Sequence, residues 1–129
     1  MPFNLSIIPE THYLHVSVSG EANYQNACEL WRAIANAAQQ HQCFNILGEQ
    51  SMRNVMPTTD AWNHQSIFLD MGITSKYKIA WVDTNPRIIE TTRFIGTVLH
   101  NRHIGYGKIF SDVDTAKEWL MKKTLAATA

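Results

Sequence analysis

The stretch that decides the fold is KYKIAWVD, residues 76–83. Its second half, residues 79–82, is continuously apolar, which is typical of a strand in a sheet that is covered on both faces. Gly72 precedes it as a helix stop signal, and Asn85-Pro86 follows it as a helix start, with Asn85 as N-cap and Pro86 at the first helical position. We therefore expect a parallel strand between two helices.

Strands and helices alternate on both sides of this stretch. The predicted elements before it are two alternating strands at 3–7 and 13–19, a helix after the N-cap Asn23, a strand at 43–48 that ends at Gly48, and a second helix from Thr58 or Thr59 to Met71. After it we expect a third helix, a short strand at 108–110 and a last helix capped by Ser111.

This order, ββαβαβαβα, predicts an α/β sandwich with a mostly parallel central sheet. The N-terminal β-hairpin adds one antiparallel strand at an edge, and right-handed crossovers join the parallel strands. Because the chain has 129 residues and no linker, repeat or low-complexity tract, we expect residues 1–129 to form one domain.

The composition excludes several classes of protein. Apolar residues make up 45% of the chain and charged residues 17%, as in ordinary globular proteins. The net charge is zero, which argues against nucleic acid as a partner. Cys28 and Cys43 form no CxxC pair and are interpreted as buried thiols in a reducing compartment, so the expected location is the cytoplasm.

The glycines of GYGKIF, residues 105–110, do not form a phosphate loop. That motif would need a glycine at position 102, which is Arg102, and Ser or Thr after Lys108, where Ile109 stands. Gly105 and Gly107 are expected to lie before the strand and turn the chain into the sheet. No metal, cofactor or nucleophile motif is found elsewhere, so we expect neither a cofactor nor an enzyme.

The second predicted helix is unusually apolar. On a wheel at about 100° per residue its apolar side chains span roughly 220°, whereas a helix that packs on a sheet needs an apolar stripe of only about 100°. These side chains are Ala61, Trp62, Ile67, Phe68, Leu69 and Met71. Two interpretations stay open: deep burial, or an apolar groove or surface that meets a lipid, a hydrophobic ligand or another subunit.

The third predicted helix is basic and would lie beside it. Its charged and ionisable side chains are Arg87, Glu90, Arg93, His100, Arg102 and His103. Adjacent apolar and basic surfaces suit an anionic amphiphile or an anionic membrane. His100 and His103 are three residues apart near the end of the helix, which is typical of histidines interacting with the helix dipole, since no further metal ligand stands at suitable spacing.

The chain resembles the SpoIIAA-like proteins in the strand at 76–83, in the phenylalanine of RFIGTVL and in the closing segment KIFSDVDTAKEWL. The matching residues are Lys78, Ala80, Val82, Phe110, Asp112, Ala116, Trp119 and Leu120. The resemblance implies a fold similar to STAS domains, which has also been likened to the lipid-carrying CRAL-TRIO fold. It also implies a small bacterial protein without an established catalytic residue, active in regulation, ligand binding or membrane association.

The phosphorylation motif of anti-anti-sigma STAS proteins is absent. These proteins carry a serine in an Asp-Ser-Ser-Gly type motif after the third strand, whereas this chain reads GEQSMRNVMPTTDAW at 48–62. Ser51 is interpreted as a loop hydroxyl, and Thr58 or Thr59 as a helix cap. A phosphorylation switch at Ser51, Thr58 or Thr59 is therefore not expected from the motif.

The hypothesis from sequence is a non-catalytic binding or regulatory domain, with an apolar site on the second and third helices for a lipid-like ligand or a membrane surface. The predicted ligand-binding residues are Trp62, Phe68, Met71, Arg87, Arg93, Phe94 and Val98. The expected partners are a hydrophobic or amphiphilic small molecule, an anionic membrane approached peripherally from the cytoplasm, or a second copy in a homodimer. The alternatives are a STAS-type protein–protein module and a small enzyme that uses His64 or His100.

Overall fold

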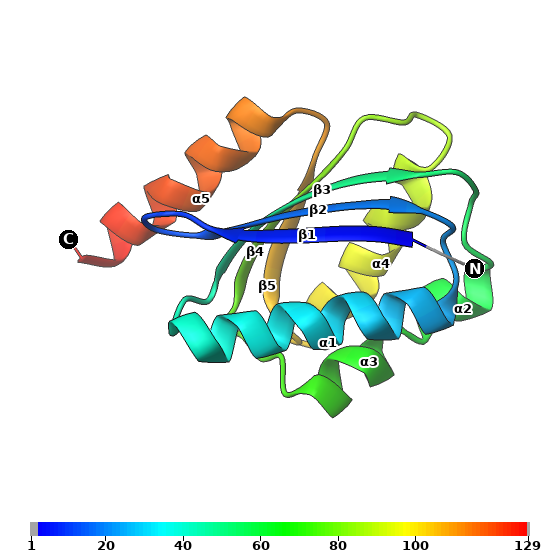
Figure 1. The fold of residues 1–129 in the computed structure, drawn as a ribbon, viewed down its shortest axis with the longest axis horizontal. Helices are drawn as coiled ribbons and strands as arrows, with labels where there is room; N and C mark the ends of the chain where they lie inside the picture. The colour runs from blue at the N-terminus through cyan, green and yellow to red at the C-terminus, as the bar shows by residue number, and fades with distance from the viewer. Residues whose placement is uncertain (1–2, 129) are drawn as a thin grey trace.

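A five-stranded sheet with helices on both faces forms the fold in a computed structural model, which describes residues 3–128 and the side chains of residues 3–122 (Figure 1). The strands are β1 (Phe3–Pro9), β2 (Leu14–Gly20), β3 (Asn45–Met52), β4 (Lys78–Asp83) and β5 (Tyr106–Phe110). The helices are α1 (Tyr24–His41), α2 (Thr58–Trp62), α3 (His64–Met71), α4 (Ile89–Asn101) and α5 (Val113–Thr128). The predicted α/β class and order of elements are confirmed.

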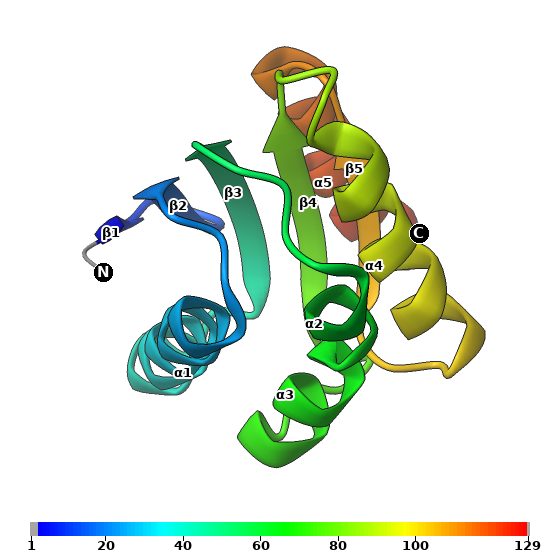
Figure 2. The ribbon, with the colours of Figure 1, turned by 90° about the vertical axis from the view of Figure 1, so that its right-hand side faces the viewer.

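The strands lie in the order β1-β2-β3-β4-β5. β1 is antiparallel to β2 and forms one edge, as predicted, while β2 to β5 are parallel to one another. Helices α1 to α4 cover one face of the sheet and α5 covers the other, and the quarter-turn view separates α1 from the group formed by α2, α3 and α4 (Figure 2). We call these the α1–α4 face and the α5 face.

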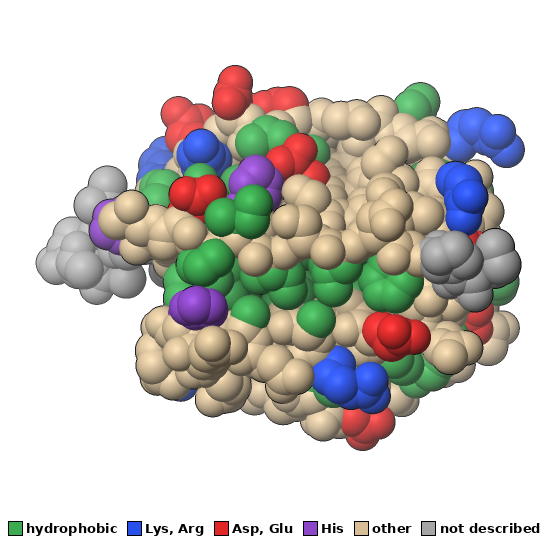
Figure 3. Space-filling view, viewed as in Figure 1, with side chains coloured by type: hydrophobic (Ala, Val, Ile, Leu, Met, Phe, Trp, Pro, Cys, Tyr) green, Lys and Arg blue, Asp and Glu red, His purple; other side chains and the backbone are tan. Residues whose placement is uncertain are grey.

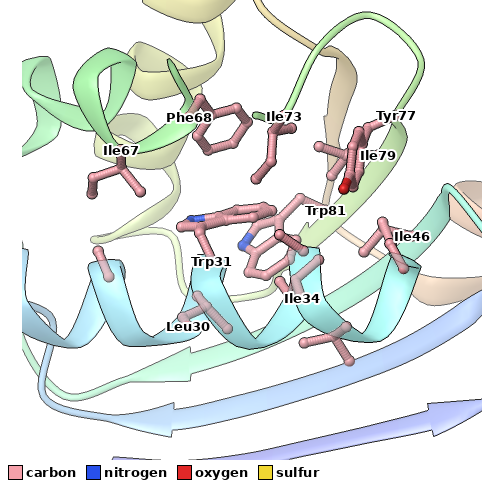
Figure 4. Packing of buried hydrophobic residues seen from close by; sticks show 14 of the residues in the cluster. Leu30, Trp31, Ile34, Ile46, Ile67, Phe68, Ile73, Tyr77, Ile79 and Trp81 are labelled. Atoms are coloured by element: carbon pink, nitrogen blue, oxygen red, sulfur yellow. The ribbon is translucent and has the colours of Figure 1, made fainter. Parts of the chain in front are cut away.

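The α1–α4 face carries the larger core. Alternate residues of the strands, among them Ile46, Ile79 and Trp81, point toward α1 and α3 and pack with Trp31 and Phe68 (Figure 4). The ring of Trp31 lies 4.6 Å from that of Phe68 and 5.0 Å from that of Trp81 between centroids, so three aromatic rings from α1, α3 and β4 are in contact. Such pairs add to the stabilisation from burial.

Gly48 makes this aromatic packing feasible. A Cβ atom at that position would lie 2.1 Å from two ring carbons of Trp81 on the neighbouring strand. The missing side chain therefore lets the Trp81 indole lie flat against β3. No other residue fits there without displacing the ring, because a packed core tolerates little extra volume.

The α5 face has a smaller core and an open part. Leu47, Ala80, Val82 and Phe110 pack against α5 through Ala116 and Leu120. β1 and β2 extend beyond this cover, and most of their side chains there are polar, as at Ser6 and Ser17, although the apolar Ile8 is also exposed. At the β1 edge, hydrophobic side chains gather in a band between β1 and α1 (Figure 3).

Several predicted element boundaries are wrong. The segment from Thr58 to Met71 is two helices, because the chain breaks at Asn63, and neither Thr58 nor Thr59 caps α2, whose N-cap is Pro57 without a side-chain bond. β3 continues past Gly48 to Met52, since it pairs with β2 over that length. β5 starts at Tyr106 and therefore contains Gly107.

The helix starts also differ in detail. Asn85 does accept a bond from the backbone N–H of Arg87 at 2.9 Å, but it caps a turn, and α4 begins only at Ile89. The last helix is capped by Asp112 rather than Ser111, because the Asp112 carboxylate accepts bonds from the backbone N–H and the hydroxyl of Thr115 at 2.8 and 2.9 Å. These bonds lower the pKa of Asp112.

Candidate functional site

An apolar cavity of about 110 Å³ lies on the α1–α4 face and is lined by residues of α1 on one side and of α3 and α4 on the other. Figure 2 shows these helices apart from one another. The cavity extends from the first turns of α1 and the β3–α2 loop, past Trp81, to the contact between α4 and β5. Its apolar wall consists of Val18, Ala22, Ala27, Leu30, Trp31, Met52, Met56, Phe68, Ile79, Trp81, Ile88, Ile95, Leu99, Ile104 and Ile109. Such a wall favours an apolar occupant.

A polar network in which the side chains hydrogen-bond to one another borders the cavity. The side-chain amide of Gln50 donates to Asp83 Oδ2 at 2.8 Å and to the Thr92 hydroxyl at 3.0 Å, and its carbonyl accepts from Trp81 Nε1 at 2.8 Å. The Thr92 hydroxyl donates in turn to Asp83 Oδ2 at 3.1 Å. Because each member is satisfied inside the protein, this network positions the Trp81 indole and offers a ligand little.

Asp83 is the charged member of this network and is only 1% exposed. Its other oxygen accepts from the backbone N–H of Asn85 at 3.0 Å, which ties the end of β4 to the turn before α4. Within residues 3–122 no basic side chain forms an ion pair with it. Hydrogen bonds alone therefore stabilise the buried carboxylate, as is required of a charge away from water.

His64 is the ionisable residue of the wall that comes from α3. It is 5% exposed, and its Nδ1 lies 3.0 Å from the carbonyl oxygen of Asp60 one turn earlier. Burial lowers the pKa of the imidazole, so the ring is neutral at neutral pH. Since a carbonyl only accepts, Nδ1 carries the proton and Nε2 keeps a free lone pair.

Asn26 adds a second buried polar group from α1. It is 5% exposed, and its side-chain nitrogen donates to the carbonyl oxygen of Glu21 at 2.9 Å. Because the amide nitrogen is used in this bond, the Oδ1 atom stays available as an acceptor, and Asn26 is one of the residues that line the cavity. The N-cap Asn23 begins α1 at this end, accepting from the backbone N–H of Asn26 at 2.8 Å.

The predicted ligand-binding residues lie in different places. Phe68 is buried and lines the cavity. Met71 is half-buried against the core, and Val98 is 6% exposed inside α4. Trp62 and Phe94 are 44% and 37% exposed and lie on the outer surface of α2 and α4. Of this predicted set, only Phe68 belongs to the cavity.

The predicted basic residues are exposed around the outer surface of α4. Arg87 and Arg93 lie outside the cavity wall, in the turn before α4 and on α4 itself. Arg102 places its guanidinium 5.4 Å from the centroid of the Trp62 ring, which joins the end of α4 to α2. Trp62 and Arg102 therefore form an exposed patch, which we call the α2–α4 patch.

Sequence reasoning missed most of the cavity wall. No motif of the sequence marks Trp31, Trp81 and Met56 as parts of one site, because the distances between them depend on sheet register and helix placement. The signal that the sequence does offer is His64, an ionisable residue in the unusually apolar second predicted helix. No group of three metal-binding side chains exists in the portion covered by the structure, and none of its helices is long and apolar enough to cross a membrane.

Comparison with known proteins shows the fold. No family model and no curated protein matches the sequence. The structure is similar to that of an uncharacterized DUF3478-family protein with a SpoIIAA-like fold from Shewanella loihica PV-4, at 15% identity over 92% of this chain and 93% of that chain, with a TM-score of 0.56. The unphosphorylated anti-sigma factor antagonist SpoIIAA aligns at 12% identity over 89% of this chain and 95% of that chain, with a TM-score of 0.47. The chain therefore has a SpoIIAA-like fold, as the sequence resemblance predicted.

Proposed function

We propose that this chain is a non-catalytic binding domain that takes up a compact apolar molecule, or the apolar end of an amphiphile, in the cavity between α1 and α4. The observation that carries the proposal is the cavity itself, about 110 Å³ in volume and walled by aliphatic and aromatic side chains. Pockets of this composition are where proteins bind small molecules.

The volume limits the ligand. An apolar cavity of about 150 Å³ in a protein core is large enough to bind benzene. A cavity of about 110 Å³ therefore suits a single ring or a short branched chain. A complete lipid would have to leave most of its chain outside, so a small ligand is favoured over the lipid-like ligand expected from the sequence.

Nuclear magnetic resonance of the indole N–H groups tests the proposal, with toluene as probe. Trp31 and Trp81 line the cavity, Trp62 lies in the α2–α4 patch, and Trp119 lies on α5 against the smaller core of the other face. We expect toluene to move the signals of Trp31 and Trp81 in a saturable way and to leave that of Trp119 unchanged. Saturable binding without shifts at Trp31 and Trp81 would refute a site in the cavity.

A pair of alanine substitutions in α1 provides the matched control. Ala27 lines the cavity, whereas Ala33 is half-buried on the same helix and does not line it. We expect Ala27→Leu to fill the cavity and weaken toluene binding at least tenfold, and Ala33→Leu to bind as the wild type does. Thermal unfolding of both variants verifies that each is folded under the conditions of the titration.

The second candidate is a STAS-type module that binds a protein through the α2–α4 patch. The supporting observation is that Trp62 and Leu69 are 44% and 65% exposed outside the cavity, with Arg102 stacked on Trp62. Exposed aromatic and Arg side chains of this kind are common at protein interfaces. Chemical cross-linking in cells, with Trp62→Ser as control, tests it: a partner captured by the wild type alone supports the module.

Flotation with liposomes separates the same patch from a membrane-binding surface. If the wild type floats with anionic but not neutral liposomes and Trp62→Ser does not float, the α2–α4 patch meets lipid. If neither protein floats, a membrane is excluded as the partner of this patch. The cavity proposal is independent of this outcome, because Trp62 does not line the cavity.

A further inference from the structure

Two polar atoms of residues in the cavity wall make no hydrogen bond within the described part of the protein, and both are acceptors. The first is His64 Nε2, whose lone pair is free because Nδ1 donates to the Asp60 carbonyl. The second is Asn26 Oδ1, left over because the amide nitrogen of Asn26 donates to the Glu21 carbonyl. Both residues are 5% exposed. Among the described side chains the polar atom that is buried without a partner is the Tyr77 hydroxyl, so neither of these two acceptors is closed off from the cavity.

Two other polar side chains of the wall, Gln50 and Thr92, use their donors and acceptors on each other, on Asp83 and on Trp81. A ligand that fills the cavity displaces water from the free acceptors, and an acceptor that it leaves without a donor costs about 1–3 kcal/mol. A ligand that supplies the donor is therefore favoured over one that does not.

We propose that the ligand of this cavity carries a neutral O–H or N–H donor on its apolar body and that this donor bonds to His64 Nε2. The inference rests on the proposed function and names the ligand class: a phenol-like or compact alcohol-like molecule. Asn26 Oδ1 is available to a second donor on the same ligand.

The charge of the wall excludes charged ligands at this end. A carboxylate or phosphate would set its lone pairs against those of His64 and Asn26, which is repulsive. A cation would lose its hydration without a carboxylate to receive it, because no acidic residue is part of the described wall. The basic side chains of the wall, Lys108 and His100, come from β5 and the end of α4 rather than from α1 and α3.

Phenol and toluene are the matched probes, since a hydroxyl in one replaces a methyl group in the other. The affinities of both are measured from the Trp31 and Trp81 indole shifts in the wild type, in His64→Gln and in His64→Phe. Gln keeps an acceptor near the position of Nε2, whereas Phe keeps the ring and removes the acceptor. We expect the preference for phenol over toluene to fall about tenfold in His64→Phe and to survive in His64→Gln.

The ¹⁵N resonances of the His64 ring supply a second measurement that needs no variant. Phenol should move the Nε2 resonance to lower frequency, as a lone pair does on accepting a hydrogen bond, and toluene should leave it in place. A phenol preference that survives in His64→Phe, or an Nε2 resonance unmoved at phenol saturation, overturns the inference while binding of both probes still supports the function. If neither probe reaches the cavity, the proposed function fails together with the inference.

Discussion

The two faces of the sheet share the same strands, but they differ in the core that each one forms with its helices. The α1–α4 face holds the aromatic cluster of Trp31, Phe68 and Trp81 and a cavity beside it. The α5 face holds a small core in which Ala80 and Ala116 allow close packing, and it leaves the polar side of β1 and β2 open. Trp31, Phe68 and Trp81 all line the cavity, so on the first face the aromatic cluster and the cavity share their residues.

The largest expected effect on stability comes from Gly48, whose missing side chain makes room for the Trp81 ring. Gly48→Ala places a Cβ about where the Trp81 ring lies, so the ring must move, and we expect the free energy of unfolding to fall by about 3 kcal/mol. Ser51→Ala, on the same strand but exposed on the other face, should stay within about 0.5 kcal/mol of the wild type. Urea unfolding measures both. Equal stability of the two variants would remove the contrast between the faces.

The aspartates at the C-terminal ends of β4 and β5 sharpen the comparison. Asp83→Ala removes the carboxylate that accepts from the Gln50 amide, from the Thr92 hydroxyl and from the backbone N–H of Asn85, and we expect a loss of about 2 kcal/mol. Asp112→Ala removes an exposed helix cap on the α5 side, so its effect should be the smaller one. Thermal and urea unfolding of both variants decide the order, and a larger loss at Asp112 would contradict it.

The pH dependence of stability should single out His64 among the histidines. Its pKa is lowered by burial, so the unfolded chain takes up a proton first as the pH falls below about 6.5, the ordinary value for histidine. The resulting stabilisation is complete above that pH and is lost as the pH falls through the folded-state pKa. We therefore expect the wild type to lose more stability between pH 7 and pH 5 than His64→Gln does.

A control for this measurement lies on the open part of the α5 face. His15 is exposed enough to reach solvent and pairs with Glu49 on the neighbouring strand. His15→Gln should keep the buried His64 and therefore retain the loss of stability in acid that burial causes. A variant at His64 whose pH profile matches that of the wild type would show that burial of this imidazole is not the cause.

The smallest expected effect is that of the His15–Glu49 pair itself. Its side chains are 28% and 37% exposed, and exposed pairs of this kind contribute about 0–1 kcal/mol. A double-mutant cycle with His15→Ala and Glu49→Ala should give a coupling in that range that decreases with added salt. A coupling as large as the effect of Gly48→Ala would mean that the open sheet surface is as rigid as the aromatic cluster.

The fold could be predicted because its signals are local. Alternation at 3–7 and 13–19 indicates a hairpin, and the apolar run at 79–82 indicates a strand covered on both sides. These strands exist, and β4 is buried along its length. The predicted end of β3 at Gly48 was wrong because a glycine there serves the neighbouring Trp81 rather than a turn.

The site could not be predicted to the same extent, because it depends on contacts between distant segments. The helical wheel assumed one uninterrupted helix from Thr58 to Met71, but the break at Asn63 changes the phase of the side chains. Trp62 consequently lies at the surface, and His64, two residues later, lies in the cavity wall. Only the three-dimensional structure brings His64 and Asn26 to the same cavity.

A crystal structure of the protein soaked in phenol tests the central claim most directly. The account predicts one ring between α1 and α4, in contact with Trp31 and Trp81, with its hydroxyl within hydrogen-bonding distance of His64 Nε2. Phenol bound only on the α2–α4 patch, with the cavity free of it, would contradict the account.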